Sequence, residues 1–211
     1  MSDYQFTKDW FHWAPDIWTH LIPMLPERKK FLEIGSFEGR SMAWIVDNML
    51  GDDAGPASVV CIDTWEGGEE HGAEDMAAVF DRFGHNRRVA QDRYWVRTKS
   101  ENSHCVVETV KGRSIHVLPH ILTNWKGSEG SYDFIYIDGS HIAKDVLTDA
   151  CMAWPLLKKG GIMAFDDYLW GDARDILHRP KLAVDAFSSI FAEELEVIHT
   201  GYQFIVRKKG E

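Results

Sequence analysis

The chain has 211 residues, of which 45% are hydrophobic, and carries a formal net charge of −10. This length and apolar content support one compact α/β domain with a substantial core, because two domains would each be small. The acidic balance argues against a broad nucleic-acid-binding or anionic-membrane surface, although it remains compatible with a nucleotide-sized ligand.

The cysteines and the first residues bear on the cellular compartment. Cys61, Cys105 and Cys151 are scattered without a Cys-x-x-Cys pair, a pattern typical of a reducing compartment and not of a zinc site. The first ten residues are polar and charged, so they do not resemble a secretory signal. No apolar run reaches the length of a transmembrane helix. We therefore expect a cytoplasmic protein.

Residues 1–30 form an arm ahead of the first expected strand, and residues 31–211 form the main domain. The arm is rich in aromatic side chains between positions 4 and 25, and its apolar spacing predicts a helix over residues 14–25. Two interpretations stay open. The arm could pack on the core, or it could form a lid over a small-molecule site, since lids are drawn from such appended segments.

A glycine turn follows the first expected strand, residues 31–34. Gly35 can adopt backbone conformations closed to other residues, and Gly39, which has no Cβ, lets the chain pass close to a ligand. A helix is expected over residues 40–50. A strand, a glycine turn and a helix start together present free N–H groups to one crevice, which suits a nucleotide. The spacing is neither the dinucleotide-binding G-x-G-x-x-G pattern nor a phosphate-binding P-loop. An ordinary strand-to-helix turn remains the alternative.

The second expected strand, residues 58–62, ends in Asp63. An acidic residue just past this strand suits the two hydroxyls of a ribose, although an aspartate there is also a common turn residue. Trp65 follows two positions later and could stack on a purine. Further along, helices are expected over residues 73–83 and 87–94, a third strand over 106–110, and a helix over 115–122.

The fourth expected strand, residues 132–137, is almost continuously apolar, which predicts burial on both faces in a parallel sheet. It ends in Asp138, and a helix is expected over residues 142–157. A helix-ending turn at residues 158–161 should lead to a fifth strand, residues 162–165, which ends in Asp166 and Asp167.

The C-terminal part predicts a helix over residues 182–194 and a closing hairpin formed by residues 195–200 and 203–208. The alternation of strands and helices indicates a Rossmann-like, doubly wound α/β sheet. Most of its strands should be parallel, with an antiparallel C-terminal strand and helices on both faces.

Five stretches carry a resemblance to a known family: FLEIGSFEGRS, CIDTWE, VKGRS, YDFIYIDGSH and GGIMAFDDY. In this order and spacing they are similar to the motifs of class I S-adenosylmethionine-dependent methyltransferases. Within that class the chain resembles the metal-dependent O-methyltransferases, such as catechol O-methyltransferase, and natural-product enzymes with an Asp-Gly-x-His signature. The similarity spans about residues 31–208.

The resemblance implies a role for each matching residue. It places Glu33, Gly35, Phe37, Gly39 and Ser41 around the methionine half of the cofactor, Asp63 on the ribose and Ser114 beside the adenine. Ser36, Trp65, Arg113 and Asp138 complete the expected cofactor site. The metal ligands of the family fall on Asp138, Asp166 and Asp167, and its general base falls on His141, which makes Asp138 and His141 the candidate catalytic pair.

Two differences from catechol O-methyltransferase limit which of its properties can be expected for this chain. Its third ligand is an asparagine where this chain has Asp167, and its base is a lysine where this chain has His141. The identity of the methyl acceptor therefore does not follow. We expect His141 to lie in the first turn of the helix after Asp138, where the helix dipole disfavours the imidazolium form.

The metal site also has support from the residues themselves. The fourth and fifth strands should be neighbours, so their terminal acids should meet at one sheet edge. Three hard oxygen ligands suit Mg²⁺, with Ca²⁺ or Mn²⁺ as alternatives, better than Zn²⁺. The competing interpretation makes Asp138 a helix cap and Asp166 and Asp167 loop acids.

The sequence thus predicts an S-adenosylmethionine-dependent methyltransferase that acts on an oxygen of a small molecule and uses a divalent ion. The alternatives are a metal-binding relative with hydroxylase- or hydrolase-like chemistry, or a non-catalytic S-adenosylmethionine-binding protein. Neither a nucleic-acid nor a membrane partner is expected. The sequence does not fix the oligomeric state, and a homodimer is compatible with it.

Overall fold

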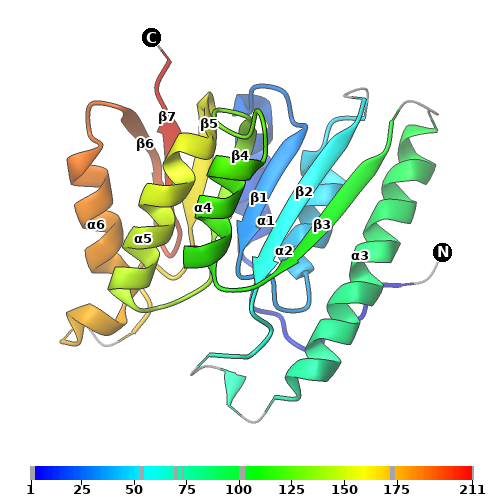
Figure 1. Cartoon of the computed structure of the whole chain (residues 1–211), viewed down its shortest axis with the longest axis horizontal. Helices are drawn as coiled ribbons and strands as arrows, with labels where there is room; N and C mark the ends of the chain where they lie inside the picture. The colour runs from blue at the N-terminus through cyan, green and yellow to red at the C-terminus, as the bar shows by residue number, and fades with distance from the viewer. Residues whose placement is uncertain are drawn as a thin grey trace.

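The computed structural model describes residues 3–52, 55–68, 71–72, 74–99, 103–171 and 174–210. Within these ranges the strands form one seven-stranded sheet in the order β3-β2-β1-β4-β5-β7-β6 (Figure 1). The strands are β1 (Lys30–Ile34), β2 (Ala57–Asp63), β3 (Cys105–Lys111), β4 (Tyr132–Ile137), β5 (Leu157–Phe165), β6 (Leu195–Thr200) and β7 (Phe204–Lys208).

The sheet changes direction of winding between β1 and β4. Strand β1 pairs in parallel with both β2 and β4, so the chain builds β2 and β3 on one side and then returns to build β4 and β5 on the other. In an open parallel sheet, such a switch point leaves a crevice at the carboxyl ends of the strands. The glycine turn after β1 and the acids after β4 and β5 all lie at this edge.

The C-terminal hairpin completes the sheet as predicted. Strand β7 inserts between β5 and β6 and runs antiparallel to both, with Phe165 opposite Phe204 and Ile162 opposite Arg207. The Rossmann-like fold class, mostly parallel with an antiparallel C-terminal strand, is confirmed.

Six α-helices in the described part of the chain cover the two faces of the sheet. In Figure 1, α4, α5 and α6 lie in front of the sheet, and α1 and α2 lie behind it. The helices are α1 (Ala14–Leu21), α2 (Arg40–Trp44), α3 (Met76–Thr98), α4 (Ser114–Asn124), α5 (Ala143–Ala153) and α6 (Pro180–Ile190). Shorter helical segments follow α1 (Ile22–Met24), α2 (Ile45–Met49) and α5 (Trp154–Leu156), and another precedes α6 (Ile176–His178).

Alternating strand residues divide the core between the two faces. Phe31 and Phe134 belong to the cluster under α1, α2 and α3, whereas their neighbours Leu32 and Ile135 belong to the cluster under α4, α5 and α6. Successive side chains on a strand point to opposite faces, so a strand covered on both sides must be apolar throughout. All six residues of β4 are buried, which explains its nearly continuous apolar sequence.

One predicted break in the helices is wrong. The helices expected over residues 73–83 and 87–94 form the single helix α3, and the expected start at Ala73 lies outside the described residues. The Asp75 side chain caps α3 by accepting hydrogen bonds from the N–H groups of Ala77 and Ala78. Buried side chains at helical spacing continue along its whole length (Val79, Phe83, Asn86, Val89, Ala90 and Tyr94).

The junction between α5 and β5 also differs from the prediction. Helix α5 ends at Ala153, and Pro155 lies in the short helical segment after it, where its lack of an N–H group ends the α-helical pattern. Strand β5 begins at Leu157, which lies opposite Tyr132. Residues 158–161 therefore belong to a strand and do not form the predicted helix-ending turn.

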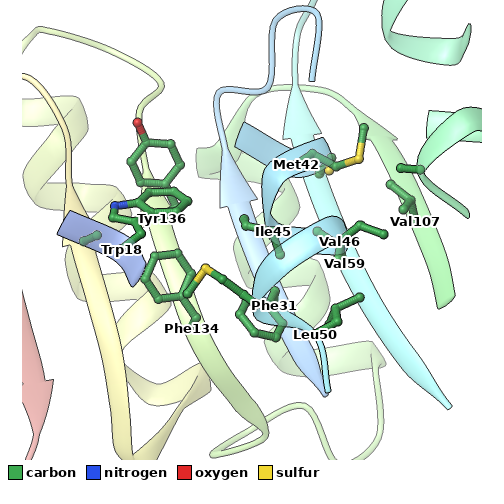
Figure 2. Close-up of a cluster of buried hydrophobic side chains, with 14 of the residues drawn as sticks. Trp18, Phe31, Met42, Ile45, Val46, Leu50, Val59, Val107, Phe134 and Tyr136 are labelled. Carbon is green, nitrogen blue, oxygen red and sulfur yellow. The ribbon is translucent and has the colours of Figure 1, made fainter. Parts of the chain in front are cut away.

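The second half of the arm is part of the core. Trp18 on α1 is fully buried, with its ring centroid 5.0 Å from that of Phe134 and 4.8 Å from that of Tyr136 (Figure 2). Its Nε1 donates a hydrogen bond of 2.8 Å to Oε1 of Gln203. Helix α1 ends at Leu21, earlier than predicted, and a short 3₁₀ segment continues to Met24. This part of the arm therefore belongs to the same hydrophobic cluster as the sheet residues that it covers.

We examined whether any helix could cross a membrane. Among the described residues, none forms a helix that is both long and apolar enough to span a bilayer.

Candidate functional site

A cavity of about 700 Å³ lies at the carboxyl ends of the parallel strands, at the switch point between β1 and β4. Most residues predicted for the site line it: Gly35, Ser36, Phe37, Ser41, Asp63, Arg113, Ser114, Asp138, His141, Asp166 and Asp167. Three further predicted residues, Glu33, Gly39 and Trp65, are not among the lining residues. The predicted residues that the cavity brings together are up to 132 positions apart in the chain, from Gly35 to Asp167.

The glycine turn is shaped by contacts within the protein. Gly35 has a φ of +86°, and a Cβ placed there would come within 1.9 Å of the carbonyl oxygen of Asp138. A Cβ at Gly39, whose φ is +77°, would meet the side chains of Met42 at 2.8 Å and Phe83 at 2.9 Å. Gly39 therefore leaves room for the packing of α2 and α3, which corrects our expectation that it leaves room for a ligand.

A Gly35→Ala substitution should destabilise the fold strongly, because Gly35 lies against the backbone of the loop after β4. Gly127 is a matched control, since its φ is +74° and nothing lies within 4 Å of an added Cβ. Gly127→Ala should cost about 1–2 kcal/mol, the strain of the left-handed conformation alone. Gly35→Ala should cost about 3 kcal/mol more, at the upper end for overpacking. Urea unfolding measures both, and equal losses would contradict this role for Gly35.

Glu33 stabilises the glycine turn through hydrogen bonds from two serines. Its side chain is fully buried, and its carboxyl accepts a hydrogen bond of 2.6 Å from Oγ of Ser36 and another from Oγ of Ser41. Burial raises the pKa of Glu33 to about 7, while the two serine hydrogen bonds oppose that shift. Glu33 therefore holds the two serines that face the cavity, instead of lining the cavity itself.

Asp63 organises the same turn from β2. Its carboxylate accepts hydrogen bonds from the backbone N–H groups of Ser36 at 2.8 Å, Phe37 at 2.9 Å and Trp65 at 2.7 Å. Phe37 and Trp65 both have positive φ, of 47° and 48°, so these bonds hold strained backbone in place. Asp63 fixes the floor of the cavity and also lines it.

The purine-stacking role expected of Trp65 is wrong. Its side chain is only 3% exposed, and its ring lies 4.8 Å from the rings of both Phe80 and Phe83. Its Nε1 donates to the carbonyl oxygen of Phe37. The left-handed backbone at Trp65 turns the indole into the core under α3, so no face of it remains for a ligand.

Asp138 and Asp166 end adjacent strands and meet at the hydroxyl of Tyr136. That hydroxyl contacts Oδ2 of Asp166 and lies 3.1 Å from Oδ2 of Asp138. A phenol carries one proton and can donate to only one carboxylate at a time. Asp138 is exposed and lines the cavity, whereas Asp166 is buried. The two carboxylates and the phenol therefore lie close together with only one proton available to hydrogen-bond them.

The crowding changes the acidity of these groups. Desolvation, followed by the charges of Asp166 and Asp167, raises the pKa of Asp138 well above its usual range. Burial and the neighbouring Asp167 raise the pKa of Asp166 to about 6. Burial and both acids likewise raise the pKa of Tyr136. Each shift has the direction expected where like charges share a poorly solvated site.

Asp167 turns toward His141. Its φ is +55°, and its Oδ2 lies 2.8 Å from Nε2 of His141, whose ring stacks on Trp170 at 4.0 Å. His141 does not lie in the first helical turn as predicted. Helix α5 begins at Ala143 with Ile142 as its N-cap, so His141 precedes the helix. Asp167 and Trp170, rather than the helix dipole, orient the imidazole.

The three predicted metal ligands share one end of the cavity without forming a closed cage. In the described part of the chain, no three His, Cys, Asp or Glu side chains are arranged to hold an ion. Tyr136 lies between Asp138 and Asp166, while Asp167 engages His141.

The other end of the cavity lies beside the loop after β3. Arg113 and Ser114 line it as predicted, together with Asp145 and Asp149 from α5. Asp149 is only 3% exposed, and burial raises its pKa to about 6 while a hydrogen bond with Ser114 opposes the shift. The sequence analysis missed this aspartate. The available signal was its place on the apolar face of α5, with Val146, Ala150 and Ala153.

The first half of the arm crosses the mouth of the cavity. The backbone N–H and the hydroxyl of Thr7 donate to the two carboxylate oxygens of Glu38, at 2.6 and 2.7 Å. Trp10 packs on Phe37 and His71 with ring centroids 5.0 and 5.9 Å away. Its neighbours also line the cavity (Lys8, Phe11 and Trp13). The structure therefore joins this segment to the glycine turn.

Comparison with known families decides what kind of protein has this site. Residues 32–168, more than half of the chain, match the family model described as a methyltransferase domain. The chain belongs to this methyltransferase family. The match runs from Leu32 in β1 to Tyr168 just after β5, and it includes the glycine turn and all three acids. It confirms the class I methyltransferase family indicated by the motifs.

Solved methyltransferases share the fold at low sequence identity. One is the O-methyltransferase TomG from Streptomyces achromogenes, which is involved in tomaymycin synthesis and was solved with S-adenosylmethionine. It is 18% identical to this chain with a TM-score of 0.63, and the match covers 93% of this chain and 80% of TomG. An O-methyltransferase from Bacillus cereus, solved with S-adenosylhomocysteine, is 16% identical with a TM-score of 0.57, covering 93% and 81%. No curated protein matches the chain.

A larger enzyme of the same fold was solved with a metal ion. MycE methyltransferase from the mycinamycin biosynthetic pathway, in complex with Mg and S-adenosylhomocysteine, is 17% identical with a TM-score of 0.57. The match covers 97% of this methyltransferase and 51% of MycE.

Proposed function

We propose that this methyltransferase transfers the methyl group of S-adenosylmethionine to an oxygen atom of a small molecule, with a divalent cation at Asp138, Asp166 and Asp167. The observation that carries the proposal is the single cavity that joins the glycine turn to these three acids. The similar structures of TomG, the Bacillus cereus enzyme and MycE, with the ligands named above, support the choice of cofactor.

The acids offer the donor atoms that a hard divalent cation needs, although their carboxylates would have to turn away from Tyr136 and His141 to enclose one. Three carboxylates and a phenol face one end of the cavity, and oxygen donors of this kind suit Mg²⁺, Mn²⁺ or Ca²⁺. The crowding of Asp138 and Asp166 around one phenolic proton is relieved by a positive charge between them. When bound, the ion would lower the pKa of an acceptor hydroxyl and fix its position.

We infer that His141 takes the acceptor's proton. The Asp167 carboxylate can only accept a hydrogen bond, so of the two neutral tautomers of His141 its contact selects the one that carries the proton on Nε2. The lone pair is then on Nδ1, the form that a general base needs near neutral pH. Stacking on Trp170 restricts rotation of the ring. Asp167 thus positions His141 as well as contributing negative charge.

The glycine turn supplies the binding surface for the methionine half of the cofactor. Asp63 and Glu33 hold the backbone and the serines of this turn before any ligand arrives, which reduces the ordering cost of binding. Ser36 and Ser41 present hydroxyls that line the cavity. This arrangement supports cofactor binding at the turn predicted from the sequence.

The acceptor would lie between the acids and the arm. Trp10 and Trp13 line this side of the cavity, and the Nε1 donor of Trp13 is buried without a hydrogen-bond partner among the described residues. An acceptor oxygen could satisfy that donor. We infer that the segment before α1 closes over the acceptor and excludes water, as a lid does. Three free cysteines fit a reducing compartment such as the cytoplasm.

The proposed function is tested by release of S-adenosylhomocysteine. The protein, S-adenosylmethionine and a small-molecule extract of cells should yield S-adenosylhomocysteine, measured by mass spectrometry. EDTA should stop its formation and excess Mg²⁺ should restore it, with heat-denatured protein as the control. Full turnover in EDTA would show that the three acids are structural and that transfer needs no ion.

A further inference from the structure

The end of the cavity away from the acid cluster has its own chemistry. The acids follow β4 and β5, whereas this second end lies at the loop after β3, with β2 and β1 between them in the sheet. It is formed by that loop, the start of α4, and residues on and just before α5 (Gly112, Arg113, Ser114, Ile115, Ile142, Asp145, Thr148 and Asp149). A cofactor that presents its methyl group to the acids must place its other end here.

Asp149 is an unusual residue for this wall. It is only 3% exposed, yet it lines the cavity and forms no ion pair within the described part of the chain. Its partner is the neutral hydroxyl of Ser114. A buried carboxylate without a charged partner is costly unless further donors reach it. A ligand donor would satisfy it.

The surrounding side chains suit a flat, apolar ring. Ile115 is 42% exposed and Ile142 is 36% exposed, and both line the cavity. Branched aliphatic side chains of this kind can cover the faces of a heterocycle, a role that the buried Trp65 does not fill. Apolar side chains and a buried carboxylate that line the same part of the cavity suit a planar base with a hydrogen-bond donor on its edge.

We propose that Asp149 accepts a hydrogen bond from the 6-amino group of the adenine and makes the site selective for adenosyl over inosyl cofactors. This inference rests on the proposed function, because it takes S-adenosylmethionine as the ligand. A carboxylate can only accept, and adenine offers an amino group where hypoxanthine has a carbonyl oxygen. The inosyl analogue would place two acceptors against each other.

The test compares S-adenosylhomocysteine with S-inosylhomocysteine by calorimetry at pH 8. The wild type should bind the adenosyl compound at least about tenfold more tightly, the effect of leaving one buried acceptor unpaired. Asp149→Asn should reduce this preference to less than about threefold, because the asparagine amide can donate to the carbonyl of hypoxanthine or accept from the amino group of adenine.

Asp145→Asn is the matched control. Asp145 lies one turn earlier on α5, lines the same part of the cavity and accepts from Oγ of Ser140 at 3.2 Å. This variant also loses one charge but should keep the adenosyl preference. A preference that survives Asp149→Asn, or that collapses in Asp145→Asn instead, overturns the inference.

The comparison of the two compounds on the wild type tests the inference even if a variant does not fold. Equal binding of the two compounds by the wild type overturns the role of Asp149 and leaves the methyltransferase function intact. Failure of the wild type to bind S-adenosylhomocysteine at all would instead contradict the proposed function. The two failures are therefore distinguishable.

Discussion

Turnover should fall by about 10²- to 10⁴-fold when His141 is replaced by alanine, the contribution that a positioned general base usually makes. The imidazole is held from two sides, by Asp167 through a contact of 2.8 Å and by Trp170 through ring stacking at 4.0 Å. This positioning is what a base requires, because proton transfer depends on hydrogen-bond reach to the acceptor. Alanine removes the base and leaves the acids in place.

The His141→Ala variant should still bind S-adenosylhomocysteine and a divalent ion with affinities close to those of the wild type. Single-turnover kinetics would then locate the loss in the transfer step. His20, exposed on α1, provides a control in which His20→Ala should leave turnover unchanged. A loss of less than about threefold in His141→Ala would show that another group, or the ion alone, removes the acceptor's proton.

The sequence alone was enough to predict at which edge of the sheet the site lies. Apolar strands that end in Asp63, Asp138 and Asp166 must place these acids at one edge if the sheet is parallel. The structure brings Asp138 and Asp166 to a single hydroxyl. That hydroxyl belongs to Tyr136, which the sequence presents as one more aromatic residue in a buried strand.

Side-chain direction was the part that the sequence could not fix. Trp65 follows a site aspartate by two positions, yet a positive φ at Trp65 turns its ring into the core. Asp63 is predicted as a ribose ligand, and the sequence did not show that its carboxylate also accepts from three backbone N–H groups of the turn. Both outcomes depend on left-handed backbone at non-glycine residues, which local sequence signals poorly because such residues rarely adopt it.

Cation binding should be largely lost when Asp166 is replaced by asparagine. Asp166 is only 7% exposed, contacts Tyr136 and accepts from the N–H of Asp167 at 2.8 Å. Asparagine keeps the size of the side chain and removes its negative charge. Changes to partners outside a ligand set typically alter metal affinity about 10- to 100-fold. Removing the charge of a ligand itself should therefore weaken the affinity for the cation by more than about 100-fold.

Asp185→Asn is the matched control for a lost carboxylate. Asp185 lies on α6 outside the cavity lining, where it pairs with Lys181 at 2.7 Å and its side chain is 47% exposed. Its replacement should leave both ion binding and methyl transfer unchanged. A control that lost ion affinity as well would indicate a general effect of net charge and not a specific site.

The most direct measurement of the central claim is a titration of the protein loaded with S-adenosylhomocysteine with Mn²⁺, followed by electron paramagnetic resonance. The wild type and Asp185→Asn should each bind a single Mn²⁺ tightly, and Mg²⁺ should displace it. Asp166→Asn should bind more than about 100-fold more weakly, because an oxygen-ligand site for such ions depends on its carboxylates. Equal Mn²⁺ binding by the wild type and Asp166→Asn would contradict a cation site at these three acids.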